Sequence, residues 1–221
     1  MKKKYKIILA ILFLSVLTIL VISYQIKSSE FLKFSDILKE EAALKKSGDR
    51  STIIAEGKNI RITEAEIALK VKTYELKGNE DPENAALKHL LERKVLLNKA
   101  IQSGYSVTEE ELDQQITLVK TALKDADNNS YYESFIAEYG SEDAYWDDIR
   151  ETTKDTMIIN KYLDHEKELF NEKNEDNIDI QASENLLADW EQYKLEIIKK
   201  LIDDENILII DNKLNSFNLL D

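Results

Sequence analysis

The stretch that decides the fold contains ITEAEI at 62–67, DPE at 81–83 and GYSVTEEEL at 104–112. Each of these segments carries a helix start signal. Thr63 and Glu66 match a capping box, in which each side chain bonds to the other residue's backbone N–H. Asp81 precedes the only proline of the chain, a residue suited to the first position of a helix. Thr108 begins a second capping box. The stretch therefore predicts three successive helices, the second of which ends at Gly104.

Short apolar segments on either side of this stretch have the composition of β-strands. Thr52–Ala55 and Asn59–Ile62 flank Glu56-Gly57, which predicts a hairpin. Ile207–Ile210 is a compact apolar run with no other strand candidate near it in the sequence. Because the backbone groups of a buried strand need partners, we expect this run to pair with the hairpin. The end of the chain should then return to the start of the domain.

Apolar periodicity and capping residues predict further helices. They are expected at 30–47, 130–140, 141–170 and 183–201. The long helix from Ser141 carries a stripe at alternating spacings of four and three residues, which is typical of a helix packed along a partner. The stripe consists of Tyr145, Ile149, Thr152, Thr156, Ile159 and Leu163. A polar break follows at 171–177, after which Ser183 is expected to cap the next helix.

The N-terminus predicts a membrane anchor. Lysines at positions 2, 3, 4 and 6 precede an apolar run over residues 7–24, and this length is at the lower limit of the roughly 17–25 residues that cross a bilayer. No Ala-x-Ala cleavage motif follows, which favours an uncleaved signal-anchor over a cleaved signal peptide. The excess of lysine before the run predicts a cytoplasmic N-terminus and an extracytoplasmic location for the bulk of the chain.

Composition excludes several classes of protein. The chain has 43 acidic and 30 basic residues and a net charge of −13, so we expect it to repel nucleic acid. Five glycines and one proline argue against an all-β or Gly-rich nucleotide-binding fold. The absence of cysteine excludes disulfides and a lipoprotein anchor. The stability of the body must therefore come from packing.

Several motifs, taken in order, resemble the SurA/PrsA-like foldases. They are KNIRITEAEI at 58–67, LLERKVLLNKA at 90–100, Gly104, Val107, TEEE at 108–111, Phe135, Tyr139-Gly140-Ser141 and Trp146. The resemblance covers Thr52 to Leu163 and departs from the family at Glu56-Gly57, where the family has Asn-Gly. It implies a mainly α fold, namely a helical SurA-type chaperone domain whose small β-sheet is formed by the N-terminal hairpin and the C-terminal strand.

The resemblance also implies a domain organisation. The chaperone domain is expected at 51–212, with an N-terminal part at 51–170, a linker at 171–182 and a returning helix and strand at 183–212. Members of the family carry a parvulin isomerase domain about where this linker lies, and here nothing is inserted. The other expected segments are a cytoplasmic tail at 1–6, a transmembrane signal-anchor at 7–24, a juxtamembrane helix or linker at 25–50 and a tail at 213–221.

The sequence offers little for enzymatic chemistry. The only histidines are His89 and His165, and no glycine lies beyond residue 140, so we expect neither a parvulin active site nor a cofactor. His89 is interpreted as an ordinary surface or boundary residue, and His165 as part of a solvated charged turn. Asp125–Asn129 offers oxygen ligands at the first positions of a calcium loop. Ser130 and Ile136 occupy positions where that loop needs glycine and glutamate, so no metal site is expected.

Aromatic residues gather between positions 131 and 146 and are the candidates for binding unfolded clients. They are Tyr131, Tyr132, Phe135, Tyr139, Tyr145 and Trp146. One interpretation places most of them in a core between two helices; the other places some of them in a cleft, since aromatic rings bury much area without sequence specificity. Trp146 lies one position off the apolar stripe and is expected to be partly exposed.

These observations predict a membrane-anchored, extracytoplasmic chaperone-like protein that holds unfolded or secreted polypeptides and has no isomerase activity. The alternative is a scaffold or regulatory subunit of a cell-envelope complex that uses the same fold to bind one specific partner. The expected partners are therefore polypeptides and, through the N-terminal helix, the membrane, with no nucleic acid. The sequence specifies neither the client nor an oligomeric state.

Overall fold

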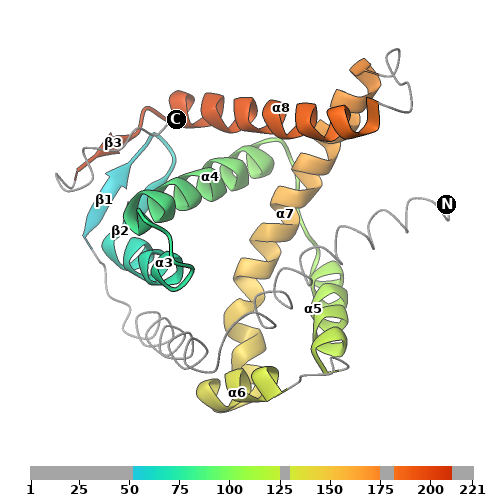
Figure 1. Cartoon of the computed structure of the whole chain (residues 1–221). Helices are drawn as coiled ribbons and strands as arrows, with labels where there is room; N and C mark the ends of the chain where they lie inside the picture. Colours follow the sequence, from blue (N-terminus) through green and yellow to red (C-terminus); the bar gives the residue numbers. More distant parts are fainter. Residues whose placement is uncertain (1–51, 125–129, 175–181, 211–221) are drawn as a thin grey trace. The chain divides into compact units, whose positions relative to one another are not determined.

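The computed structural model describes residues 52–124, 130–174 and 182–210 (Figure 1). The elements in chain order are β1 (Ile53–Glu56), β2 (Arg61–Thr63), α3 (Glu64–Leu76), α4 (Pro82–Gln102), α5 (Glu109–Lys124), α6 (Ser130–Tyr139), α7 (Glu142–Asn174), α8 (Ala182–Glu205) and β3 (Leu208–Ile209). The structure is mainly helical and contains a small three-stranded antiparallel sheet, so this part of the predicted fold class is confirmed.

The described residues form two compact units. The described residues of the α5–α6 unit are 109–124 and 130–150, and those of the sheet unit are 52–108, 151–174 and 182–210. The division falls inside α7, whose first turns belong to the α5–α6 unit and whose remaining turns belong to the sheet unit. Residues 175–181 of the expected linker at 171–182 lie outside the described residues.

The sheet has the strand order β2-β1-β3. β1 pairs with β2 in antiparallel register, with Ala55 opposite Ile62 and a shift in register between Ile53 and Ala55. β3 pairs with the other side of β1, where Ile209 lies opposite Ala55. The predicted hairpin and the predicted return of the chain's end to it are both confirmed. β3 is shorter and more open than the expected buried strand, because it lies at an edge of the sheet.

The helices of the sheet unit begin where the sequence predicts. Thr63 and Glu66 form the capping box of α3, with the Glu66 N–H donating to the Thr63 hydroxyl over 3.4 Å. Asp81 accepts a bond from the Asn84 N–H at the start of α4, and Pro82 is the first helical residue. Gly104 follows the end of α4 with φ 87°, a left-handed conformation that glycine adopts without strain.

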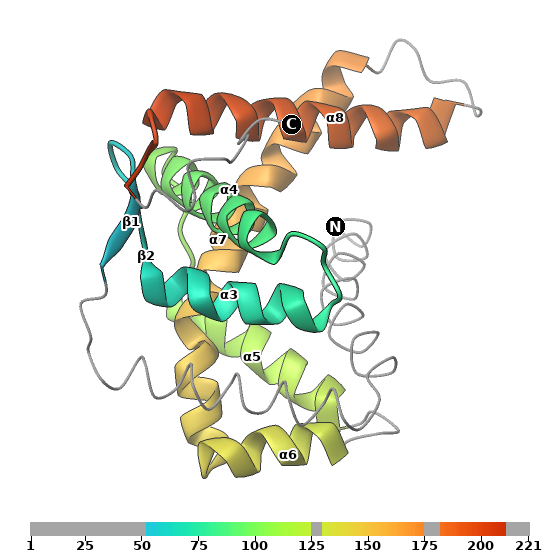
Figure 2. The same cartoon turned by 60° about the vertical axis from the view of Figure 1, so that its left-hand side comes forward.

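Helix α4 supplies much of the core of the sheet unit. Its buried residues are Ala86, Leu87, Leu90, Leu91, Val95, Leu96 and Ala100. α4 packs against both α3 and α8, and Figure 2 shows it lying between them, with the C-terminal ends of α4 and α8 beside the sheet. Each large apolar side chain that leaves water here stabilises the fold by roughly 1.5–3 kcal/mol.

The later helices differ from the predictions in detail. α7 continues to Asn174, so the helix extends into the expected break at 171–177, and α8 begins at Ala182, which places Ser183 inside the helix. The predicted stripe of α7 is only partly correct, since Thr152 is exposed. The buried residues of α7 are Trp146, Ile158, Ile159, Tyr162 and Phe170. One continuous stripe does not describe this helix because its two parts contribute to different units.

Several predicted segments lie outside the described residues. They are the tail at 1–6, the anchor at 7–24, the juxtamembrane segment at 25–50, the calcium-loop-like residues 125–129 and the C-terminal tail at 213–221. Among the helices of 52–124, 130–174 and 182–210, none is both long enough and apolar enough to span a membrane.

Candidate functional site

The predicted aromatic residues lie in α6 and at the start of α7, within the α5–α6 unit. The structure brings four of their rings together. The Tyr145 ring is central, with its centroid 5.0 Å from that of Trp146, 5.2 Å from that of Tyr139 and 6.4 Å from that of Tyr132. These arrangements are edge-to-face, the geometry that aromatic quadrupoles favour. Tyr131 and Phe135 belong to α6, and their side chains lie outside the described part of the structure.

Trp146 is a core residue of this unit. Its side chain is only 5% exposed, and its indole N–H donates a hydrogen bond of 3.1 Å to the Tyr132 hydroxyl, which belongs to a residue 7% exposed. The expectation that Trp146 is partly exposed is therefore wrong. The position next to the predicted stripe suggested exposure, but Trp146 contacts Tyr132 of α6 and Lys120 of α5, and Tyr145 of the stripe packs beside it.

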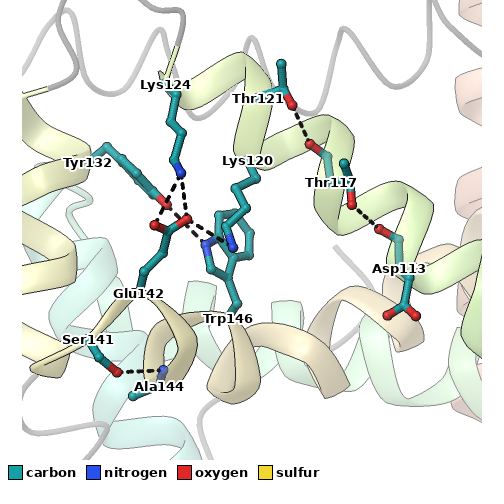
Figure 3. Close-up of polar contacts among 10 residues, drawn as sticks. All are labelled: Asp113, Thr117, Lys120, Thr121, Lys124, Tyr132, Ser141, Glu142, Ala144 and Trp146. Atoms are coloured by element: carbon teal, nitrogen blue, oxygen red, sulfur yellow. Dashed lines mark hydrogen bonds and ion pairs between the residues drawn. The ribbon is translucent and has the colours of Figure 1, made fainter.

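A group of charged residues borders the rings (Figure 3). Lys120 and Lys124 of α5 both lie 3.0 Å from the Glu142 Oε1 at the start of α7. The Lys120 ammonium also lies 5.7 Å from the centre of the Trp146 ring, a cation–π contact. One glutamate thus links two turns of α5 to α7, and one of its lysines covers the buried indole.

The two lysines and the Tyr132 hydroxyl lower the pKa of the Glu142 carboxyl group. Hydrogen bonds from Lys120, Lys124 and Tyr132 favour the carboxylate and lower its pKa to about 2. Burial raises the pKa of Tyr132 to about 12, and the neighbouring Glu142 adds to this effect. The tyrosine is therefore a neutral phenol at physiological pH, able to accept the indole bond and to interact with Glu142.

Residues at the junction of α6 and α7 fix the positions of the two helices. Gly140 has φ 81°, which ends α6 in the left-handed region. The Ala144 N–H donates to the Ser141 hydroxyl over 3.1 Å, a helix cap that begins α7 (Figure 3). The Tyr139 hydroxyl donates to Asp148 Oδ2 over 3.1 Å, which joins the end of α6 to the second turn of α7. The Gly140-Ser141 turn predicted from sequence is therefore the joint that sets the ring cluster.

A second ionic contact joins α5 to α7 within the same unit. The Arg150 guanidinium lies 2.7 Å from Glu109 Oε2 and 2.7 Å from Asp113 Oδ1, so it binds the first turns of α5 through two carboxylates. Further along α5, the hydroxyls of Thr117 and Thr121 donate back to carbonyls one turn earlier, over 2.7 and 2.9 Å (Figure 3). Both ends of the α5–α7 pair are thus held by polar contacts that flank the aromatic rings.

The arrangement as a whole is that of a small packed core with a polar border. Within the parts of the chain that the structure describes, no three His, Cys, Asp or Glu side chains come together as a metal site. The buried rings of Tyr132 and Trp146 hold the unit together. Tyr139 and Tyr145 are only half-buried, and Leu118 of α5 is exposed.

The sheet unit contains a polar cluster that sequence reasoning missed. Glu205, the last residue of α8, is only 7% exposed. Its carboxylate accepts hydrogen bonds from the Asn59 N–H over 2.7 Å, the Asn59 side-chain amide over 3.0 Å and the Asn98 amide over 3.1 Å. The Lys58 N–H donates to the Glu205 carbonyl over 3.0 Å. We call these four residues the Glu205 clasp; it joins the hairpin turn, α4 and the end of α8.

The sequence contains little that identifies this clasp. Glu205 follows Asp203 and Asp204 in a run of acids, and such runs are usually solvated. The one sequence signal is Gly57 in the hairpin turn. A Cβ atom there would lie 2.8 Å from Ile207 Cδ1 and 3.1 Å from Glu205 Oε2, so a larger residue would push against the clasp.

The two histidines take part in aromatic contacts. The ring centroid of His89 lies 6.3 Å from that of Tyr74, and burial, together with the charges of Lys70, Arg93 and Lys77, lowers the pKa of His89 to about 4. His89 is thus a half-buried boundary residue, as interpreted from sequence. His165 is exposed and lies within α7, inside the helix predicted for this stretch.

Comparison with known proteins returned no match to any family model, curated protein or solved structure. The similarity to SurA/PrsA-like foldases therefore stays a prediction from the motifs.

Proposed function

We propose that this protein is a membrane-anchored, extracytoplasmic holdase that binds apolar segments of unfolded or secreted polypeptides without isomerase chemistry. The observation that carries the proposal is the return of β3 to the β1–β2 hairpin. This closure is the arrangement that the resemblance implies for a chaperone module without an inserted isomerase domain. The elements that make it are β1, β2, α3, α4, α8 and β3.

Exposed apolar side chains on the sheet unit support this proposal. They are Ile101, Leu187, Leu195, Leu208 and Ile210. Such side chains offer contact to an apolar client segment without requiring a particular sequence, which suits a holdase. The net charge of −13 keeps a protein–client complex soluble through repulsion between complexes.

The direct test is suppression of aggregation by the purified full-length protein in detergent micelles. A urea-unfolded model protein is diluted into buffer with the protein at equimolar and several-fold excess, and light scattering is followed. We expect slower aggregation and no acceleration of prolyl isomerisation, whose uncatalysed time is on the order of tens to hundreds of seconds. Unchanged scattering at several-fold excess would refute the holdase, and accelerated isomerisation would refute the absence of isomerase chemistry.

The proposed location has its own test. In intact cells, the full-length protein should fractionate with membranes and lose its described domains to protease added from outside, since the lysines before residues 7–24 orient the anchor. Mature protein recovered from the medium and beginning shortly after residue 24 would show instead that the N-terminal segment is a cleaved signal.

The burial of Trp146 and Tyr132 favours a second candidate, a scaffold or regulatory subunit of an envelope complex. A unit whose rings form its own core presents a fixed surface, and a fixed surface suits one folded partner better than many unfolded ones. Capture from a cross-linked envelope fraction with the full-length protein separates the two functions. A holdase should recover many polypeptides substoichiometrically, whereas a scaffold should recover one partner at a constant ratio.

A further inference from the structure

The outer edge of β3 has the chemistry of a strand-binding site. The Ile210 N–H donates to the Ile54 carbonyl over 2.8 Å, so Ile210 bonds to β1. Because successive residues of an antiparallel strand direct their backbone groups to opposite sides, the N–H and C=O of Ile209 face away from β1. Among the described residues, no strand lies on that side, since the order is β2-β1-β3.

The side chains on this edge are apolar and open. Leu208 is 65% exposed and Ile210 is 48% exposed, and residues two apart lie on the same face of a strand. Exposed edge strands are usually protected by lysine, proline or a bulge. The run 207–210 contains neither lysine nor proline. An extended chain placed beside β3 would therefore gain both backbone bonds and apolar contact.

Exposed acidic residues a few positions before β3 in the sequence favour some extended chains over others. Asp203 and Asp204, at the end of α8, are exposed, and the protein as a whole carries a net charge of −13. A segment flanked by lysine or arginine would be attracted, and a segment flanked by acids would be repelled.

We propose that the outer edge of β3 binds an extended apolar client segment, flanked by lysine or arginine, as a fourth strand of the sheet. Backbone hydrogen bonds to Ile209 hold the segment, and Leu208 and Ile210 contact its alternate side chains. This inference rests on the proposed holdase function and specifies where the client binds and which clients are preferred.

The test uses the full-length protein in detergent micelles and a fluorescent peptide of alternating valine and threonine with lysines at both ends. Fluorescence anisotropy gives its affinity. The same peptide with alternate amides N-methylated keeps its side chains but cannot bond along one edge, and we expect it to bind at least about 2- to 12-fold more weakly, the loss of one hydrogen bond or more. A glutamate-flanked peptide should also bind more weakly, and this difference should shrink in high salt.

Variants of the protein provide the complementary arm. Ile209→Pro removes an N–H that makes no bond to β1, so the sheet should keep its pairing while peptide affinity falls by about 2- to 12-fold. Leu208→Ser with Ile210→Ser should weaken binding similarly. Leu118→Ser, an equally simple loss of an exposed apolar side chain on α5, is the matched control and should bind as the parent does. The N-methylated peptide tests the unaltered protein, so the proposal stays testable if Ile209→Pro does not fold.

The outcomes distinguish failure of the strand-binding site from failure of the holdase function. Suppressed aggregation together with equal binding of the methylated and unmethylated peptides would overturn the strand site and leave the holdase standing. Edge-dependent peptide binding without suppressed aggregation would support the site and refute the holdase. Peptide binding that appears only after deletion of 211–221, or a dimer abolished by Ile209→Pro, would assign the edge to the chain's own tail or to a second copy and overturn the proposal.

Discussion

Glu205 and Asn59 lie 146 residues apart in sequence, yet the Glu205 carboxylate accepts bonds from both the backbone N–H and the side-chain amide of Asn59, over 2.7 and 3.0 Å. The donors that surround this carboxylate are neutral amides, including that of Asn98. The contact fastens the end of α8 to the hairpin turn immediately before the chain enters β3. Closure of the chain's ends therefore depends on a buried polar cluster as well as on strand pairing.

Removal of the Glu205 carboxylate should destabilise the sheet unit. Glu205→Ala leaves three part-buried hydrogen-bond donors without their acceptor. Because water reaches these donors in part, each should cost less than the roughly 1–3 kcal/mol of a fully buried unsatisfied donor. Glu205→Gln keeps the shape but turns one acceptor into a donor that faces other donors. Urea unfolding should show a larger loss of unfolding free energy for Glu205→Ala than for Glu205→Gln. The control is Asp204→Asn at an exposed neighbour, which should change stability by less than about 0.5 kcal/mol. Unfolding of Glu205→Ala at the parent's midpoint would contradict the clasp.

Gly57→Ala should be destabilising because the added Cβ would lie 2.8 Å from Ile207 Cδ1. Overpacking of this kind costs typically about 1–3 kcal/mol. Ile207→Val removes the Cδ1 atom, so the double variant should recover part of the loss. A double-mutant cycle in urea measures this coupling. Additive effects of the two substitutions would show that the turn relaxes away from Ile207 and that this contact does not require glycine.

Trp146→Ala should cost folding stability of the α5–α6 unit, about 3–5 kcal/mol for a buried large side chain. Trp146→Phe keeps a ring and loses the bond to Tyr132, so its cost should be nearer 1 kcal/mol. Leu118→Ala, an exposed site on α5, serves as the control. Circular dichroism follows unfolding, and aggregation suppression is measured on the same samples at a temperature where every variant stays folded. Lost suppression by folded Trp146→Phe would show that the indole contacts clients despite its burial.

The Glu142 carboxylate should make the α5–α6 unit sensitive to acid. Its pKa is lowered from 4.5 to about 2 in the folded protein, so its stabilising contribution is complete above pH 4.5 and is lost as the pH falls towards 2. The chain has one tryptophan in each unit, at positions 146 and 190. In a Trp190→Phe background, the tryptophan fluorescence therefore comes from Trp146 alone and follows unfolding of the α5–α6 unit. Glu142→Gln should flatten the pH dependence of unfolding below pH 4.5; an unaltered slope would remove Glu142 as its source.

Protonation of His89 should destabilise the sheet unit, and it should do so at a higher pH than protonation of Glu142 destabilises the α5–α6 unit. Its pKa is lowered from 6.5 to about 4 by burial and by neighbouring positive charges. The neutral ring is therefore favoured by folding, and this stability is complete above pH 6.5 and lost as the pH falls to 4. Unfolding of the sheet unit at each pH is measured by Trp190 fluorescence in a Trp146→Phe background. His89→Gln should remove the dependence between pH 6.5 and 4, whereas His165→Gln, at an exposed site, should retain it.

The sequence by itself was sufficient for features that depend on neighbouring residues. The capping box of Thr63 and Glu66, the start of α4 at Pro82 and the turn at Gly140 each rest on groups within a few residues of one another. A local conformation of this kind carries its own residue signature. The closure by β3 was also predictable, because an apolar strand run needs a partner and the sequence offered only one candidate sheet.

Tertiary structure alone decided the features that depend on residues far apart. Trp146 is buried because α5 and α6 meet it, and no pattern within α7 contains that information. Glu205 resembles its acidic neighbours in sequence, yet only its side chain points to Asn59 and Asn98. Whether a polar or aromatic side chain is exposed depends on what the fold places opposite it. The physical reason is that burial and hydrogen bonding are properties of pairs of surfaces, whereas a sequence pattern describes one surface at a time.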